Sequence, residues 1–94
     1  MGSRILVRMR ECIRKRQYVM TLHAEEEMDN DGLTIYDVES IILTGALIEQ
    51  QRDRKSGQRK YLVRGETVEG TQTAVVVSRF GPTDKLVILT TYAE

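Results

Sequence analysis

Apolar residues recur with a helical period near the start of the chain. Within residues 4–16, Met9 follows Ile5 by four positions, and Cys12 and Ile13 follow Met9 by three and four. Arginine and lysine lie between these apolar residues. Such spacing places apolar side chains on one side of an α-helix, so it predicts a helix over residues 4–16 with a buried stripe. The outer face of this helix is expected to be basic.

A second helix is predicted over residues 21–31. Thr21 suits an N-cap, because its hydroxyl can accept a free backbone N–H of the first turn, and Gly32 suits a left-handed exit. The segment between them is rich in acidic residues. A short acidic helix is therefore expected.

A third helix is predicted from Ile35 to about Leu43. Thr34 and Asp37 are spaced like a capping box, with aspartate in place of the usual glutamate, and Gly45 is expected to end the helix. The residues expected to face the core are Ile35, Val38, Ile41 and Ile42.

Beyond Gly45 the apolar period changes from about 3.6 to 2. β-Branched and aromatic residues dominate four runs, and the segments "DRKSGQ", "VEGT" and "GPTD" between them favour turns. The predicted strands are residues 46–51, 60–66, 73–80 and 85–92. Short connections favour antiparallel neighbours, so the expected sheet is a four-stranded meander.

The expected architecture is one α+β domain over residues 1–94, with two to three N-terminal helices packed on one face of a four-stranded antiparallel meander sheet. The runs "AVVV" and "LVIL" are apolar at successive positions, so both sheet faces need cover. The helices cover one face. The other is expected to meet a partner chain or to form the wall of a binding cleft, unless sheet twist and long side chains shield it.

Size and composition limit where a function can lie. Ninety-four residues build one core without an internal cofactor-sized cavity, so no cofactor is expected and the function belongs to a surface or a shallow cleft. One cysteine, Cys12, expected to be buried, and one histidine, His23, cannot form a zinc site of four Cys or His ligands, and no metal site is predicted. Without a signal-like start or an apolar run of roughly 20 residues, a cytoplasmic location is expected.

Charge is segregated along the chain, although the formal net charge is zero. Residues 1–20 carry six basic residues and one acidic residue, and residues 50–65 carry the same numbers. Residues 21–49 carry eight acidic residues and neither lysine nor arginine. The acidic segment is either a solvated face or a patch that meets a basic partner.

The second basic segment surrounds a predicted hairpin and suggests contact with nucleic acid, because guanidinium groups match the oxygens of a phosphate. The candidate RNA-binding residues are Arg52, Arg54, Lys55, Lys60 and Tyr61. A period of two places Lys60, Leu62 and Arg64 on one face of their strand. Tyr61 and Val63 lie on the other. The alternative is a solvated hairpin whose charges guard a sheet edge.

The chain also offers the groups needed to cleave RNA without a metal. The reaction needs a base for the 2′-hydroxyl proton, a cation for the charge on the phosphate oxygens and an acid for the leaving 5′-oxygen. The candidate catalytic residues are His23, Arg59, Arg64, Arg79 and Tyr92. His23 would be the base or the acid, and Tyr61 or Tyr92 a proton shuttle or a stacking ring. Alternatively, His23 fills a gap between helix and sheet.

Short motifs in a fixed order resemble a family of small prokaryotic proteins. "HAEEEM" at residues 23–28 and "DGLTIYDVESII" at residues 31–42 resemble its H-A-x-x-R-M and R-G-I-s-x-x-D-V signatures. "KYLV" at residues 60–63 and "VILTTY" at residues 87–92 resemble its R-Y-x-V and I-I-T-x-Y strands. The resemblance covers about residues 8–92.

That family in turn resembles the RelE/ParE group of toxin–antitoxin proteins, which share helices followed by a curved antiparallel sheet and whose RelE-like branch cuts mRNA. The resemblance implies a toxin-like ribonuclease domain held by a partner, a small zinc-finger-type antitoxin with Cys-x-x-Cys pairs. Such a partner would cover the second sheet face.

Individual residues follow the family pattern with one departure. The matching positions are His23, Ala24 and Met28 in the first motif, with Arg59, Tyr61 and Tyr92 at or near the later polar positions. Glu27 stands where the family usually has arginine. A carboxylate one helical turn from His23 would repel a phosphate backbone, or it is a surface change without consequence.

The expected function is that of a toxin-like, metal-independent endoribonuclease acting on RNA. One alternative is a non-catalytic binding module of the same fold that holds an antitoxin or a toxin target such as gyrase. Another is a structural homodimer formed through the uncovered sheet face.

Overall fold

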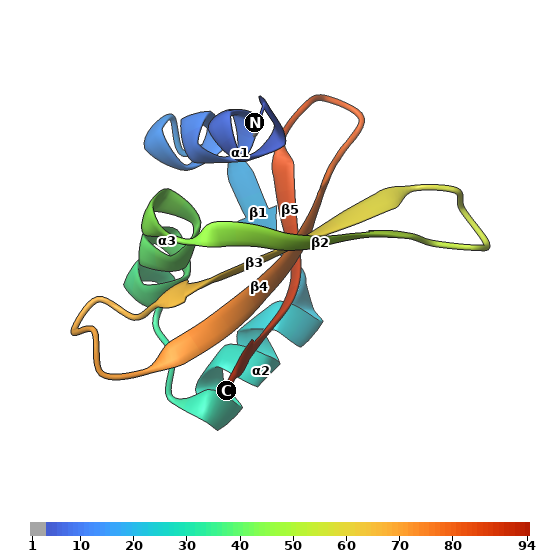
Figure 1. The fold of residues 1–94 in the computed structure, drawn as a ribbon. Helices are drawn as coiled ribbons and strands as arrows, with labels where there is room; N and C mark the ends of the chain where they lie inside the picture. Colours follow the sequence, from blue (N-terminus) through green and yellow to red (C-terminus); the bar gives the residue numbers. More distant parts are fainter. Residues whose placement is uncertain (1–3) are drawn as a thin grey trace.

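The computed structural model describes residues 4–94 and shows three helices and a five-stranded sheet (Figure 1). The elements in chain order are α1 (Arg4–Arg14), β1 (Tyr18–Met20), α2 (Leu22–Asp31), α3 (Ile35–Thr44), β2 (Ala46–Arg52), β3 (Arg59–Glu66), β4 (Thr73–Phe80) and β5 (Leu86–Ala93). The strand order across the sheet is β1-β5-β4-β3-β2. The α+β class and the antiparallel run from β2 to β5 are confirmed.

The prediction of a four-stranded, purely antiparallel sheet is wrong, because β1 adds a fifth strand parallel to β5. Tyr18 pairs with Leu86 and Met20 with Ile88. Three residues are too few to show a period of two, so the sequence pattern did not reveal this strand. The Tyr18 hydroxyl donates to Glu39 of α3, and burial together with this hydrogen bond raises the pKa of Tyr18 to about 12.

All three helices pack on one face of the sheet, as predicted. They share a single cluster of buried residues with the inward-facing positions of β3, β4 and β5. The buried residues of α1 are Leu6, Met9, Cys12 and Ile13. Leu6 therefore takes the place expected for Ile5, which is half-buried at the edge of the cluster. The prediction that Cys12 is buried is confirmed.

The predicted helix caps are present. The Thr21 hydroxyl accepts the Ala24 N–H at 3.0 Å, and Gly32 ends α2 in the left-handed region with φ 69°. Thr34 and Asp37 form the complete capping box of α3. Local sequence chemistry therefore places these two helices to within a residue of their predicted ends.

Gly45 ends α3 for a tertiary reason rather than through a left-handed turn. Its φ of −85° and ψ of −166° are extended values that any residue adopts. A Cβ atom at Gly45, however, would lie 2.3 Å from the Arg64 carbonyl oxygen and 2.4 Å from that of Ile41. Only glycine allows α3 to approach β3 this closely. Arg10 of α1 completes the junction by donating to the Ile42 and Gly45 carbonyls at 3.0 and 2.9 Å.

α2 lies along the edge of β5 beyond the short β1 (Figure 1). The Thr21 hydroxyl donates to the Leu89 carbonyl at 3.0 Å, and the Asp31 carboxylate accepts the Ala93 N–H at 2.9 Å. Because the helix binds these edge groups, β5 does not end in an open row of donors and acceptors. β2 lies at the opposite edge of the sheet, and its residues are mostly exposed.

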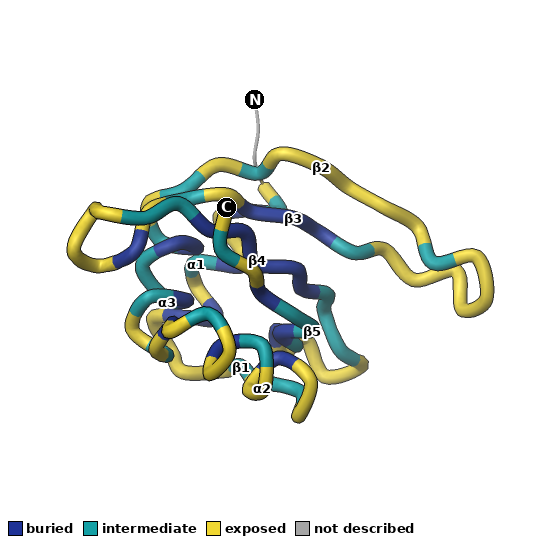
Figure 2. The backbone as a smooth tube through the Cα atoms, turned by 90° about the horizontal axis from the view of Figure 1, so that it is seen from below, coloured by how far each residue is buried: buried dark blue, intermediate teal, exposed yellow. Residues whose placement is uncertain are grey.

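The sheet face opposite the helices carries a second, smaller apolar cluster of Leu62, Val75 and Val77, against which Leu89 packs. The cluster residues are 7%, 0% and 8% exposed within the chain itself. Figure 2 shows β3 and β4 buried at their centres, whereas β2 and the turn that follows it are exposed along most of their length. For these three positions, the twist of the sheet and neighbouring side chains already provide the cover that this face needs.

Candidate functional site

The sheet face opposite the helices, here called the open face, combines this small apolar strip with basic and aromatic side chains. Strand alternation and the observed register assign its members. Its members on β3, β4 and β5 include Lys60, Leu62, Arg64, Val75, Val77, Arg79, Leu89 and Tyr92, and Glu49 of β2 lies opposite Leu62 on the same face. Three of the predicted catalytic residues therefore lie on one surface, namely Arg64, Arg79 and Tyr92.

Arg64 and Tyr92 stand on either side of Val75, because the register pairs Val75 with both. The Arg64 guanidinium is bound by Glu94, with Nε to Oε1 at 2.8 Å and Nη2 to Oε2 at 3.0 Å. These hydrogen bonds and the charge of Glu94 raise the pKa of Arg64 above its ordinary value. The guanidinium fork is thus already occupied by a carboxylate.

Lys60 and Arg79 form the other basic end of the open face. Tyr61 pairs with Ser78, so Lys60 and Arg79 lie side by side one position further along the same ladder. Both side chains are half-buried. Neither takes part in an ion pair with any residue of the described range 4–94. Two adjacent cations without a carboxylate partner favour an anionic ligand.

The β2–β3 hairpin extends away from the helices and ends in a tightly bonded turn (Figure 1). The Asp53 carboxylate accepts the Lys55 N–H at 2.8 Å, and Gly57 adopts φ 73°. Hydrogen bonds from the Lys55 and Ser56 N–H groups hold the pKa of Asp53 below its ordinary range. The one acidic residue of the turn between β2 and β3 therefore shapes that turn, and the cations around it are exposed: Arg52, Arg54, Lys55 and Arg59.

The hairpin cations do not all lie on the open face. Arg59 is paired directly with Arg52, and strand alternation puts Arg59 on the same side of β3 as Tyr61 and Val63. Arg52 and Arg59 line a shallow depression of about 220 Å³. The structure thus separates Arg59 from the open-face residues with which it was grouped as catalytic, although all belong to one basic hairpin and its neighbouring strands.

His23 lies on the exposed surface of α2, two residues after the Thr21 cap. Thr21 is bonded to Leu89, whose side chain packs on the open-face strip, so the start of α2 lies at the β5 rim of that face. His23 forms no hydrogen bond or ion pair with the residues from 4 to 94, and Glu27 one turn later is half-buried. The alternative of a gap-filling histidine bonded to a carbonyl is not what the structure shows.

Tyr61 is the one predicted RNA-binding residue that the structure removes from the surface. It is 7% exposed and belongs to the helix-side core. Its ring meets that of Phe80 edge to face at a centroid distance of 5.9 Å, and the Arg8 guanidinium lies 4.0 Å from the Phe80 ring centre. The prediction that Tyr61 stacks on a base is therefore corrected, because its ring is packed in the apolar core between the helices and the sheet.

Comparison with known proteins identifies a family. The family model described as a domain of unknown function, DUF4258, matches residues 20–93. The chain belongs to the DUF4258 family. No curated protein and no solved structure matches the chain. The DUF4258 match includes His23, the basic hairpin and Tyr92, whereas α1 and Glu94 lie outside it.

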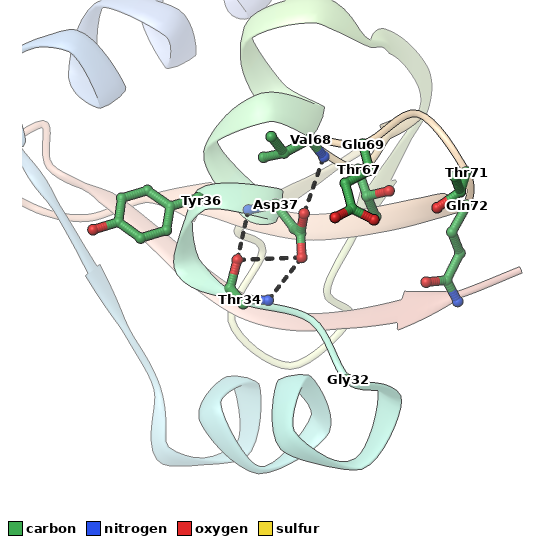
Figure 3. Close-up of a pocket in the computed structure, with 9 residues that line it drawn as sticks. All are labelled: Gly32, Thr34, Tyr36, Asp37, Thr67, Val68, Glu69, Thr71 and Gln72. Carbon is green, nitrogen blue, oxygen red and sulfur yellow. Dashed lines mark hydrogen bonds between the residues drawn. The ribbon is translucent and has the colours of Figure 1, made fainter.

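A polar cleft of about 450 Å³ lies elsewhere in the DUF4258 region, between the start of α3 and the β3–β4 turn (Figure 3). At its centre the Asp37 carboxylate accepts the Thr34 N–H at 2.9 Å and the Val68 N–H at 3.0 Å. Partial burial acts to raise the pKa of Asp37, but the hydrogen bonds from Val68 and Thr34 outweigh it and hold the pKa below its ordinary value. These bonds give Asp37 a structural role.

Two features are absent from the part of the DUF4258 chain that the structure describes. No three His, Cys, Asp or Glu side chains gather there in a way that would hold a metal ion. No helix there combines the length and the apolar character needed to cross a membrane.

Sequence reasoning missed the Glu94 partner of Arg64. The two residues are thirty positions apart and meet only because β3, β4 and β5 are adjacent in this register. The signal that was available is the basic–acidic pairing of two predicted strands, and it becomes specific only when the register is known.

Proposed function

We propose that this DUF4258 protein binds RNA on its open face and cleaves it as a metal-independent endoribonuclease of the RelE/ParE toxin type. The observation that carries the proposal is the pair of adjacent cations, Lys60 and Arg79, which have no ion-pair partner in the described chain and border a strip of Leu62 and Val77. Lysine and arginine bind phosphate oxygens, and the exposed ring of Tyr92 on the same face can stack on a base.

The proposed reaction is transfer of the phosphoryl group to the neighbouring 2′-oxygen. The 2′-hydroxyl loses its proton to a base and its oxygen bonds to phosphorus. The bond from phosphorus to the 5′-oxygen breaks, and that oxygen takes a proton from an acid. The products are a 2′,3′-cyclic phosphate and a 5′-hydroxyl, and the charge on the phosphorus oxygens needs a cation throughout.

The residues of the open face take these roles in the proposal. Lys60 and Arg79 hold the nonbridging oxygens of the reacting phosphate. Tyr92, 40% exposed on β5, lies beyond the apolar strip in the row of Val75, so it stacks on a neighbouring base, and the 5′-oxygen takes its proton from water. His23, at the β5 rim, is the base that receives the 2′-hydroxyl proton. The basic hairpin binds the RNA on one side of the cleavage site.

The partner in this proposal is an antitoxin of the zinc-finger type, as the resemblance to toxin–antitoxin proteins implies. It would prevent cleavage by covering the open face. The exposed rim of that face supplies apolar contact area at Val19 and Tyr92.

A second candidate function is a non-catalytic module that binds another protein, or a second copy of this chain, through the open face and the β2 edge beside it. The exposed β2 edge favours this candidate, because Ile48 is 41% exposed and the strand has no neighbour on its outer side. The two candidates differ in their dependence on His23, which matters for cleavage and not for such binding.

The test is cleavage of a mixed-sequence RNA by the purified protein in EDTA, with and without translating ribosomes. Wild type should cleave, and His23→Ala and Arg79→Gln should each lose cleavage while keeping their thermal melting temperature. Arg4→Gln is the matched control and should cleave normally, because Arg4 is an exposed cation of α1 without an ion pair among residues 4–94. Absence of cleavage by wild type in both settings would contradict the enzymatic proposal and favour the binding module.

A further inference from the structure

The carboxylate of Glu94 occupies Arg64 in the way that a phosphate would. It binds the guanidinium through two parallel hydrogen bonds, Nε to Oε1 at 2.8 Å and Nη2 to Oε2 at 3.0 Å. Arginine binds carboxylate and phosphate with the same two-pronged geometry, because both groups present two oxygens to the planar fork. A phosphate and Glu94 therefore compete for one set of donors.

The contact is built so that it opens without disturbing the fold. The two side chains are 49% and 35% exposed, and an ion pair at that exposure adds little stability. The end of β5 is held separately, since the Glu94 N–H donates to the Thr73 carbonyl at 2.9 Å. The Glu94 side chain can leave Arg64 while its backbone stays in the sheet.

Position makes the contact relevant to RNA. Arg64 lies on the open face in the same row as Val75 and Tyr92, beyond the apolar strip from Lys60 and Arg79. RNA lying across the strip from the Lys60 end would reach Arg64 with its next phosphates. While the Arg64–Glu94 contact is intact, the RNA would instead meet the negative charge of Glu94.

We propose that Glu94 is an autoinhibitory group, a carboxylate that blocks a phosphate-binding site on Arg64 and must be displaced by RNA. This inference rests on the proposed RNA binding by the open face. It assigns Arg64 to binding of a second phosphate. Because RNA must break the Arg64–Glu94 contact, the free energy of that contact weakens RNA binding.

The experiment compares the binding of a fluorescent single-stranded RNA of mixed sequence by wild type, Glu94→Gln, Arg64→Gln and the double variant. Glu94→Gln should bind about three- to tenfold more tightly than wild type, because one competitor and one repulsive charge are removed. The slope of log affinity against log salt should steepen by about 0.7, the value expected for one further phosphate contact. The double variant should lose both gains.

Glu69→Gln is the matched control, because it removes one exposed acidic charge from the nearby β3–β4 turn without touching an arginine. If wild type binds RNA and Glu94→Gln behaves like Glu69→Gln, or binds more weakly, the autoinhibitory contact is refuted while RNA binding stands. If none of the folded variants binds RNA, the proposed function fails and this inference fails with it. Equal melting temperatures, within about 4 °C, establish that the variants are folded.

Discussion

The chain has two basic segments with the same number of positive charges, but most cations of the first bind partners within the protein and most cations of the second do not. In the first segment, Arg10 binds the carbonyls that end α3, Arg8 pairs with Asp84, and Arg14 and Lys15 pair with Glu11, whereas two further arginines have no ion pair within residues 4–94. In the basic hairpin and β3, only Arg64 has an ion-pair partner within residues 4–94. Charge counts alone therefore do not separate structural cations from those available to a ligand. The two groups are distinguished by the partners that each cation has in the folded protein.

The largest expected effect comes from the α3–β3 junction that Arg10 supports. Gly45→Ala should destabilise the protein by about 3 kcal/mol or more, because the added Cβ meets two backbone oxygens that cannot move aside. Gly57→Ala in the hairpin turn meets no atom within 4 Å and only has to tolerate φ +73°, which costs about 1 kcal/mol. Chemical denaturation of both variants measures the difference, and equal losses would contradict the close-packed junction.

The next effect separates the two groups of cations directly. Arg10→Met should cost about 2 kcal/mol, since two charged hydrogen bonds to helix-end carbonyls are lost and those carbonyls stay half-buried. Arg54→Met, at the exposed tip of the hairpin, should change stability by no more than about 0.5 kcal/mol. The free energy of unfolding of each variant is the measurement. A stability loss at Arg54 as large as that at Arg10 would remove the distinction.

The third effect concerns RNA affinity rather than stability. Replacing Lys60 and Arg79 together by glutamine should weaken RNA binding about tenfold or more and reduce the salt slope by about 1.4, or 0.7 for each lost phosphate contact. Replacing Arg4 and Arg16 of the first basic segment, both exposed and without an ion pair in the described chain, should leave the slope unchanged. Equal slopes for the two double variants would mean that RNA is attracted by overall charge alone.

The smallest effect distinguishes two acidic residues in the same cleft. The folded pKa of Asp37 lies below its ordinary value, so Asp37 contributes stability above about pH 4 to 5 and loses that contribution as the pH falls through its folded pKa. Asp37→Asn should therefore be destabilised by less than about 1 kcal/mol near neutral pH, with the gap closing in acid. Glu69→Gln should follow the wild-type curve throughout. A gap for Asp37→Asn that persists unchanged in acid would argue against the carboxylate as its source.

Much of the fold could be predicted from local sequence chemistry. Thr21, Gly32 and the Thr34–Asp37 pair marked the ends of α2 and α3 correctly, because caps depend on residues only a few positions apart. β1 escaped prediction because it gains its stability from pairing with β5, a strand about seventy residues later. Gly45 ends α3 as predicted, but the need for glycine there could not be predicted, since the backbone atoms that exclude a side chain belong to β3 and α3.

The candidate site was predictable only in part. A period of two correctly separated Tyr61 from Lys60, but it did not tell which side of β3 the helices would cover. Tyr61 therefore was expected on RNA and lies in the core. Arg64, Arg79 and Tyr92 share a surface because of strand order, which depends on contacts between distant segments. Their shared role in binding RNA stays a prediction.

Binding of RNA to the open face and the basic hairpin can be followed in the amide NMR spectrum of the protein while a single-stranded RNA of mixed sequence is added. We expect shifted or broadened signals along β3, β4, β5 and the hairpin turn, with α1 unchanged. Changes confined to α1 or the acidic surface of α2, or no change at RNA concentrations up to about 1 mM, where even weak non-specific binding would register, would contradict it.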